Sequence, residues 1–531
     1  MYWPEVLSKE IQSKLKEPYH VDDMKTPSGQ IHIGSLRGVL IHDVIHKQFL
    51  KEGKQSEYTY IYNDMDPMNK VPVYLNGYDS ELGKPLFNIK APEGDLNFAE
   101  YFADIFTNAF NTIGANPTIL YSSQMYKAGK FNEVIKEALD KVEEIRKVYQ
   151  EVAGYEKPEG WYPVQVICPQ CGKVGTTIVT GWDGTNVQFE CKTDLVKWAV
   201  GCGFKGEIYP FDGNAKLMWK VDWPAHWKVL GINVEGAGKD HSSAGGSRDM
   251  AVHLCKMFGI PEPMDIPYEW FLTKEGTKMS TSKGIGMYAK DLIELLPPEV
   301  ARFLILRTHY NSAILFDPND DTVPDLYDEF DRCGKNYYMK EDEATFDAKG
   351  NKIDKDIDAS KYFESAIIRD HFKTTNFLPR FRTLSVLIQM PSIDIYEWAK
   401  TEKGAELTES EKTILDERIA FANIWLKSYA PEKYLFRFSE NIPEGTKDLT
   451  DAQKAFLKSV SEMLQTIYAQ DKTADELQFD IYELTKKMVI PSKDAFKAIY
   501  ISLIGKDSGP KAGWLIKDIG YANVVERFSS L

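Results

Sequence analysis

Residues 19–50 read YHVDDMKTPSGQIHIGSLRGVLIHDVIHKQFL, and the residue types in this stretch predict a strand, a tight loop and a helix. After the loop, apolar residues recur at near-helical spacing: Leu36, Leu40, Val44 and Phe49. Gly29 and Gly34 fall where the backbone must turn, and Ser35 is placed to cap the helix. Because a helix start exposes free N–H groups and partial positive charge, this stretch predicts a phosphate site.

His32 lies just before the expected helix start. An imidazole there can donate a hydrogen bond to a phosphate as negative charge builds up in a transition state. The alternative is a histidine in an ordinary strand-to-helix turn with no ligand. His32 alone does not decide between them.

A second stretch, KEGTKMSTSKG at 274–284, combines three lysines, two glycines and four hydroxyl side chains. Glycine lets backbone N–H groups close around an oxyanion, while lysines and hydroxyls supply further donors. A solvated surface loop has the same composition. Paired with the histidine-bearing loop, however, the second stretch favours a phosphate-binding loop.

Composition sets broader limits. The chain has 531 residues, 43% of them hydrophobic, so it can bury a large core and should form two or more domains. A formal charge of −15 argues against binding nucleic acid through the overall field. We found neither the apolar run of a secretory signal nor a membrane span, and we expect a cytoplasmic protein.

Four of the six cysteines lie within one short region. Cys168 and Cys171 form a C-x-x-C-G pattern typical of a zinc knuckle, and Cys191 and Cys202 could complete a tetrahedral site. The second pair is irregularly spaced. We favour structural zinc over reduced, buried cysteines. Cys255 reads as a core residue of a helix.

Beyond residue 300 strand signals become scarce. Capping boxes recur ahead of amphipathic runs at Thr408/Glu411, Thr450/Gln453 and Thr473/Glu476. These predict a helical C-terminal domain. Lys506, Lys511 and Lys517 around Trp514 could form a phosphate-facing patch, or simply end a helical bundle.

HIGS and KMSTSK resemble the two signature motifs, HIGH and KMSKS, of class I aminoacyl-tRNA synthetases. Together with TPSGQIHIGSLRG, KLMWKVDWPAHW, GAGKDH and IGKDSGPKAGWL they resemble the class I lysyl-tRNA synthetases. That resemblance covers most of the chain. It implies a Rossmann-like α/β catalytic domain with an inserted cysteine-rich zinc module, followed by an all-α domain that reads the tRNA anticodon.

The resemblance implies the catalytic and ATP-binding residues. The catalytic set is His32, Gly34, Lys278, Ser280, Ser282 and Lys283. The ATP-binding set is Ser28, Gly29, His32, Gly34, Ser35, Gly238, Asp240, Lys278 and Met279. Two positions depart from the motifs, since Ser35 replaces the second histidine and Thr281 replaces a lysine. We expect Lys278 to contact phosphate and Lys283 to substitute in part for the missing lysine.

A lysine pocket needs a carboxylate for the ε-ammonium and aromatic faces along the alkyl chain. Asp64 follows the predicted strand EYTYIYN at the end where ligands of open α/β sheets bind. The expected lysine-binding set is Gly29, Asp64, Trp219, His241 and Tyr268. Core packing is the alternative for Trp219 and Tyr268.

The expected domains are residues 1–160 and 213–310 for the two halves of the catalytic domain, 161–212 for the insertion and 311–531 for the helical domain. We expect ATP and Mg²⁺ as substrate and cofactor, structural Zn²⁺, and tRNA(Lys) and L-lysine as partners of a monomer. Three alternatives stay open: a class I synthetase for glutamate or cysteine, a small-molecule nucleotidylyltransferase, and a synthetase-like protein that binds RNA without catalysis.

Overall fold

The computed structural model describes residues 1–154, 156–242, 245–273, 275–277, 286–339, 345–346, 352–353, 355–374, 377–466 and 472–531. The chain forms two compact units. The first comprises Met1–Phe316 and Met339–Ile368, and the second comprises Asp317–Tyr338 and Arg369–Leu531.

The first unit is built on a parallel sheet with strand order β3-β2-β1-β9. Its strands are β1 (Tyr19–Lys25), β2 (Ser56–Tyr62), β3 (Thr118–Tyr121) and β9 (Val234–Glu235). Isolated parallel bridges join Val234 to Met264 and Gly238 to Tyr268 beyond β9. The strand order reverses between β1 and β9, and ligands of such sheets bind at the carboxyl ends of the strands beside this reversal. The predicted α/β fold with a parallel sheet is confirmed.

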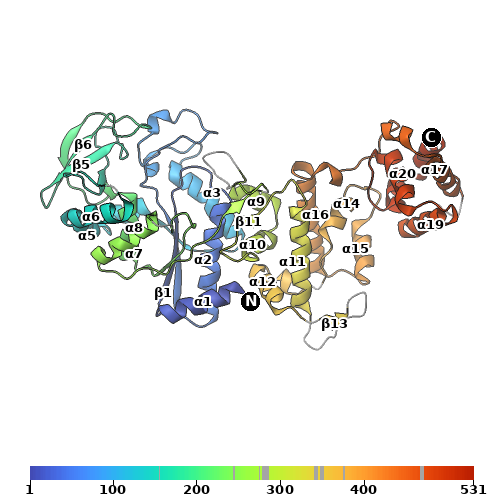
Figure 1. Ribbon diagram of the computed structural model, residues 1–531, viewed down its shortest axis with the longest axis horizontal. Helices are drawn as coiled ribbons and strands as arrows, with labels where there is room; N and C mark the ends of the chain where they lie inside the picture. The colour runs from blue at the N-terminus through green and yellow to red at the C-terminus, as the bar shows by residue number, and fades with distance from the viewer. Residues whose placement is uncertain are drawn as a thin grey trace. The chain divides into compact units, whose positions relative to one another are not determined.

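Helices cover both faces of this sheet. Figure 1 shows α2 and α3 on one side and α5 to α8 on the other. The helices and 3₁₀ turns around the sheet are α1 (Trp3–Lys14), α2 (Gly34–Lys51), η1 (Asp79–Glu81), η2 (Leu86–Asn88), α3 (Phe98–Thr112), α4 (Ser122–Lys127), α5 (Asn132–Asp140), α6 (Val142–Ala153), α7 (Trp219–Leu230) and α8 (Ser247–Phe258). One core joins Ile61 of the sheet to apolar residues of α4 to α8.

A cysteine-bearing segment is inserted between β3 and β9. It contains the antiparallel pair β4 (Val164–Val166) and β8 (Ala215–Leu217) and the antiparallel sheet β5 (Thr177–Trp182), β6 (Val187–Cys191) and β7 (Lys205–Ile208). The rest of the first unit comprises β10 (Phe271–Leu272), α9 (Ala289–Leu295), α10 (Pro298–Leu306), β11 (Ile314–Leu315), β12 (Thr345–Phe346), β13 (Lys352–Ile353) and α12 (Ile357–Ala366).

The second unit is helical throughout its described residues. Its elements are α11 (Thr322–Tyr338), α13 (His371–Thr374), α14 (Phe381–Leu387), α15 (Ile395–Lys403), α16 (Glu409–Ser428), η4 (Glu432–Tyr434), η5 (Glu444–Asp448), α17 (Asp451–Leu464), α19 (Ala474–Lys487), α20 (Ser492–Ile504), α21 (Ala512–Ile519) and α22 (Tyr521–Ser529). The three predicted capping boxes form at the starts of α16, α17 and α19. Both backbone donors at each start are therefore satisfied locally.

Candidate active site

A cavity of about 260 Å³ opens at the carboxyl ends of β1 and β9, where the strand order reverses. Its walls come from β1, from the start of α2, from α7 and from the chain that follows β9. The lining residues are Asp23, Met24, Lys25, His32, Gly34, Ser35, Tyr60, Trp219, Trp223, Glu235, Gly236, Ala237, Gly238, Asp240, His241, Tyr268 and Trp270. Of the sequence-predicted site residues, this cavity brings together His32, Gly34, Ser35, Trp219, Gly238, Asp240, His241 and Tyr268.

His32 is held by the first residue of α2. The Gly34 N–H donates to His32 Nδ1 over 3.0 Å, so Nδ1 is an acceptor and the ring proton of the neutral imidazole lies on Nε2. A Cβ at Gly34 would lie 2.6 Å from His32 Cε1 and 2.7 Å from Nδ1. Glycine is therefore required for this arrangement. The sequence predicted Ser35 as the cap of this helix. Ser35 instead lies inside the first turn of α2 and does not cap it, and the His32 ring accepts the first backbone N–H.

The segment containing His32 is pinned by residues that follow the second predicted loop. Ile33 N–H donates to Met287 O over 3.0 Å, Ala289 N–H donates to Ile31 O over 2.9 Å, and His32 forms an antiparallel bridge with Tyr288. The carboxyl flank of KEGTKMSTSKG therefore lies beside the start of α2. Five predicted site residues within that loop lie outside the described residues: Lys278, Met279, Ser280, Ser282 and Lys283.

Aromatic rings form the α7 side of the cavity. Trp219 and Trp223 are one helical turn apart, and their rings are stacked with centroids 5.1 Å apart. His241 meets Trp223 edge-on at 5.8 Å. Tyr268 approaches from the chain beyond β9, where its N–H donates to Ala237 O over 3.0 Å. Such faces suit an alkyl chain that ends in a cation.

Two buried carboxylates line the cavity that sequence reasoning did not single out. Asp23 is 8% exposed and Glu235 is 1% exposed. Burial, reinforced by Glu235, raises the pKa of Asp23 well above its usual range. Burial raises the pKa of Glu235 to about 7 although the Trp223 and Trp227 indole N–H groups donate to it. The two adjacent acids of VDDM, inside a predicted strand, were the signal for Asp23.

Asp22 lies on the opposite face of β1 from Asp23 and pairs in register with Glu235. It is fully buried, and burial together with Glu235 raises its pKa well above the usual range. Thr59 donates to one of its oxygens. The end of the sheet therefore holds three buried acids whose pKa values are raised, chiefly by burial.

His42, one turn beyond Gly38 on α2, links this helix to the end of β9. The Gly236 N–H donates to His42 Nε2 over 2.8 Å, so Nδ1 carries the proton and donates to Gly38 O over 2.7 Å. Burial lowers the His42 pKa to about 4, which keeps the ring neutral. A Cβ at Gly38 would lie 2.6 Å from both Asp23 Oδ2 and the Tyr268 hydroxyl. Glycine there lets α2 approach Asp23 closely.

Three predicted ligand residues lie outside the set of described residues that line the cavity. Asp64 is buried and turned toward α4, where its carboxylate accepts hydrogen bonds from the Ser123 N–H over 2.7 Å and from the Ser123 hydroxyl. Ser28 is exposed. Gly29 packs against Tyr74, whose hydroxyl would lie 2.8 Å from a Cβ at that position. Asp64 therefore does not line the cavity, whereas Asp23 does.

The sequence matches the family described as tRNA synthetases class I (K) over residues 1–354. This chain belongs to that family. It is 33% identical to the lysine–tRNA ligase of Methanosarcina barkeri strain Fusaro, an alignment covering 99% of this chain and 97% of the relative. It is 30% identical to the lysine–tRNA ligase of Archaeoglobus fulgidus over the full length of both chains. A glutamate tRNA ligase structure from Elizabethkingia meningosepticum, at 14% identity, aligns over 97% of this chain and 99% of its own with a TM-score of 0.44.

Within this class I synthetase, the four predicted cysteine ligands come together in the inserted segment. The ligand atoms of Cys168, Cys171, Cys191 and Cys202 all lie within 4.8 Å of one another. The Cys168 and Cys202 sulfurs are 3.6 Å apart, and the Cys171 and Cys191 sulfurs are 3.7 Å apart. Four thiolates roughly 2.3 Å from a tetrahedral zinc lie about 3.8 Å from one another. The donor set therefore has the size and chemistry of a zinc site.

The helical unit of the synthetase carries a second cavity, of about 630 Å³, between α11, α14, α15 and α21. Its aromatic lining residues are Tyr338, Phe377, Trp398 and Trp514, and its cationic ones are Lys335, Arg380, Arg382 and Lys511. Of the predicted lysine patch, Lys511 lies here, with its ammonium 4.6 Å from the Trp514 ring centre. Lys506 and Lys517 instead donate to backbone carbonyls.

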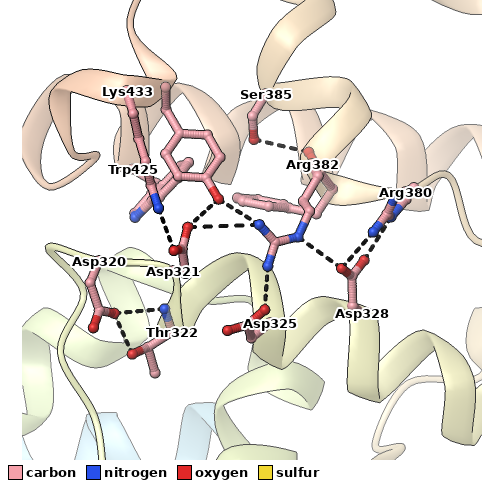
Figure 2. A network of polar contacts seen from close by, with 12 residues as sticks. Asp320, Asp321, Thr322, Asp325, Asp328, Arg380, Arg382, Ser385, Trp425 and Lys433 are labelled. Atoms are coloured by element: carbon pink, nitrogen blue, oxygen red, sulfur yellow. Dashed lines mark hydrogen bonds and ion pairs between the residues drawn. The ribbon is translucent and has the colours of Figure 1, made fainter. Parts of the chain in front are cut away.

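Arg382 anchors one wall of this second cavity. Figure 2 shows its guanidinium joined to acids of α11, with 2.8 Å to Asp328 and a further contact to Asp325. Arg380 makes a bidentate pair with the same Asp328 at 2.9 and 2.8 Å. Tyr434 accepts a further hydrogen bond from Arg382 over 2.5 Å. These contacts fix α14 against α11 and hold both arginines at the rim of the cavity.

Among the residues that the structure describes, no helix is long and apolar enough to cross a bilayer.

Proposed function

We propose that this protein is an ATP-dependent lysine–tRNA ligase. It activates L-lysine to lysyl-adenylate with release of pyrophosphate, and then transfers the lysyl group to the 3′ end of tRNA(Lys). The observation that carries the proposal is one cavity at the strand-order reversal that is lined by a histidine-bearing helix start, by buried carboxylates and by aromatic rings. The full-length likeness to lysine–tRNA ligases supplies the substrate.

The start of α2 would hold the ATP phosphates. Its first-turn N–H groups carry partial positive charge, and His32 carries its ring proton on Nε2 because Nδ1 accepts from Gly34. In the first step a carboxylate oxygen of lysine bonds to the α-phosphorus and the bond to pyrophosphate breaks. His32 would stabilise the charge that builds on the phosphate oxygens. Mg²⁺ would arrive bound to the triphosphate and neutralise part of its charge.

Lysine would lie with its alkyl chain against Trp219 and Tyr268 and its ε-ammonium at Asp23. Asp23 is the better partner than Glu235, because both Glu235 oxygens already accept indole N–H groups. A buried ammonium requires a charged acceptor, so a neutral amino acid of similar length would leave Asp23 buried and unpaired. His241 and Asp240 complete the rim around the reacting carboxylate.

In the second step the terminal ribose hydroxyl of tRNA attacks the lysyl carbonyl and AMP leaves. We propose that the helical unit binds another part of the same tRNA, at its anticodon. The aromatic rings and the four cations of this cavity, which also contains Glu402 and Asp475, support this, because stacking surfaces and cations are the groups that bind unpaired nucleotides. Ribosomes consume the product, so the proposal places the protein in the cytoplasm.

The inserted segment would bind one structural zinc through Cys168, Cys171, Cys191 and Cys202. The metal would tie β6 to the loop before β5 and to the loop before β7. Zinc chemistry of this kind stabilises a small fold and takes no part in the reaction.

The proposal is tested by amino-acid-dependent ATP–pyrophosphate exchange with the purified protein, Mg²⁺ and each of the twenty amino acids. Exchange with lysine and not with the other nineteen is expected. Exchange with glutamate or cysteine would show that the protein activates that amino acid, by the same reaction, and not lysine. No exchange with any amino acid, with or without tRNA, would leave only the non-catalytic RNA-binding alternative.

A further inference from the structure

A polar network centred on a buried lysine joins the two walls of the active-site cavity. Lys216 on β8 is 1% exposed, and its ammonium pairs with Asp66 and lies 3.9 Å from an oxygen of Asp222. Asp66 also accepts a hydrogen bond from the Thr26 hydroxyl over 2.6 Å. Tyr126 donates to Asp222. None of these five side chains lines the cavity among the described residues.

Each end of this network is adjacent in sequence to residues that do line the cavity. Thr26 directly follows Lys25, at the end of β1. Asp222 lies on α7 between Trp219 and Trp223, whose rings form the opposite wall. Lys216 therefore connects the β1 wall to the α7 wall through two carboxylates.

Burying a charged lysine costs desolvation free energy, so this network calls for a functional reason. Burial disfavours the Lys216 ammonium, and Asp66 and Asp222 outweigh that effect and raise its pKa. Well-packed apolar residues are often as stable as a buried ion pair, whereas the ion pair fixes one relative position of the elements that carry it. What this network fixes is the separation of the two walls.

We propose that Lys216 is a positioning residue that sets the separation of the Lys25 wall from the Trp219 and Trp223 wall, and thereby the length of side chain that the cavity accepts. The inference rests on the proposed activation of lysine. It adds that selectivity for side-chain length depends on a residue that does not touch the substrate.

The test compares lysine with ornithine, which is one methylene shorter and carries the same charge. Exchange kinetics are measured for wild type, Lys216→Met and Lys216→Arg. In Lys216→Met the kcat/KM for lysine should fall at least about tenfold, since an ångström of misplacement can cost on the order of 10²-fold. The fall should lie mainly in KM for lysine, with KM for ATP changing less than about twofold. The ratio of kcat/KM for lysine to that for ornithine should fall, and Lys216→Arg should restore most of it.

Lys228→Met is the matched control. Lys228 lies on α7 and, like Lys216, pairs with an acid, Glu137 at 2.6 Å, but its side chain is partly exposed. In Lys228→Met the ratio of kcat/KM for lysine to kcat/KM for ornithine should equal that of wild type. An unchanged ratio in folded Lys216→Met, or an equal rise in KM for both substrates, would overturn the proposal.

Two further measurements keep the test decisive. If Lys216→Met does not fold, Asp66→Asn removes the same ion pair with little change of shape and should lower the same ratio; an unchanged ratio there would also overturn the proposal. Quenching of tryptophan fluorescence by lysine measures binding without turnover, and loss of the signal in Trp219→Phe assigns it to the cavity wall. Failure of the proposed function would show separately, as wild-type protein without lysine-dependent exchange.

Discussion

Gly34 lies so close to the His32 ring that any side chain would displace the ring. A methyl group there would sit 2.6 Å from His32 Cε1, well inside van der Waals contact. The backbone of α2 itself favours alanine over glycine by up to about 1 kcal/mol. Gly34→Ala should therefore move the imidazole without destabilising the helix.

We predict that Gly34→Ala lowers lysine-dependent pyrophosphate exchange roughly 10²-fold while the melting temperature is unchanged or slightly higher. Adding Gly34→Ala to the His32→Ala variant should lower exchange little further, because the imidazole ring that the new methyl group would displace is already absent. Full additivity of the two losses would show that Gly34 acts through something other than His32.

Asp23 provides a prediction with a pH dependence. Its pKa is raised by burial and by Glu235, so without lysine the side chain holds its proton at a pH where an exposed aspartate is ionised. Only the ionised form pairs with the ε-ammonium, which itself stays charged to about pH 10. The affinity for lysine should therefore rise as pH increases through the pKa of Asp23.

Asp23→Asn should lower lysine affinity at least about tenfold and remove most of this pH dependence, because asparagine does not titrate. Fluorescence titrations with lysine between pH 6 and pH 9 give both quantities. Asp64→Asn is the contrasting variant, since Asp64 is occupied by Ser123 away from the cavity. A larger loss of affinity in Asp64→Asn than in Asp23→Asn would contradict the assignment.

At the scale of elements, the sequence was informative wherever a structure depends on near neighbours. The strand, loop and helix of residues 19–50 could be predicted because apolar spacing and glycine positions act locally. The three capping boxes in the helical unit formed for the same reason, since Thr and Glu or Gln three residues apart satisfy each other's backbone groups.

The same local reasoning failed where partners come from distant strands. Glu235 reaches the site only because β9 pairs with β1, and Asp22 lies opposite it in that register. Asp64 seemed the natural acid because it ends a strand, but α4 follows directly after β3 and supplies Ser123 to bind it. The prediction that Ser35 caps α2 was wrong, because the His32 ring accepts the Gly34 N–H at the helix start. Lys216 gave no sequence signal, because its two carboxylates lie on separate elements.

The inserted sheet β5-β6-β7 should depend on its metal. We expect about one zinc per chain, and its loss in Cys171→Ser, with a melting temperature lower by roughly 5 °C if about 2 kcal/mol is lost. Cys255→Ser is the control, because Cys255 is a buried residue of α8 outside the cluster. Metal analysis and thermal denaturation give the two readouts. Stoichiometric zinc in Cys171→Ser would exclude this ligand set.

At the scale of the whole molecule, tRNA binding and lysine activation should be separable. Lys511→Ala should raise the KM for tRNA(Lys) in aminoacylation and lower the slope of its salt dependence by about one unit, as expected for one lost phosphate contact. Lysine-dependent pyrophosphate exchange without tRNA should not change, because the cavity that holds Lys511 lies in the helical unit.

Lys486→Ala is the matched control for this prediction. Lys486 also lies over an aromatic ring, Tyr482 at 4.5 Å, but on α19 away from the residues that line the cavity. Its KM for tRNA should equal that of wild type. Equal effects of the two variants would show that Lys511 acts only through general charge.

The two units are interleaved along the chain, because residues 339–368 return to the first unit after α11 has been contributed to the second. Within that returning segment, Lys361 of α12 pairs with Glu5 of α1 at 2.6 Å, and Ser365 hydrogen-bonds to the Tyr2 hydroxyl. A ribosome therefore releases α1 long before the partner that covers it, with a delay on the order of tens of seconds at ordinary elongation rates. During translation α1 therefore lacks the α12 contact until residues 357–366 have been made. In a permuted gene that begins with α12, only residues 367–531 would separate the two helices, and the delay would be roughly halved.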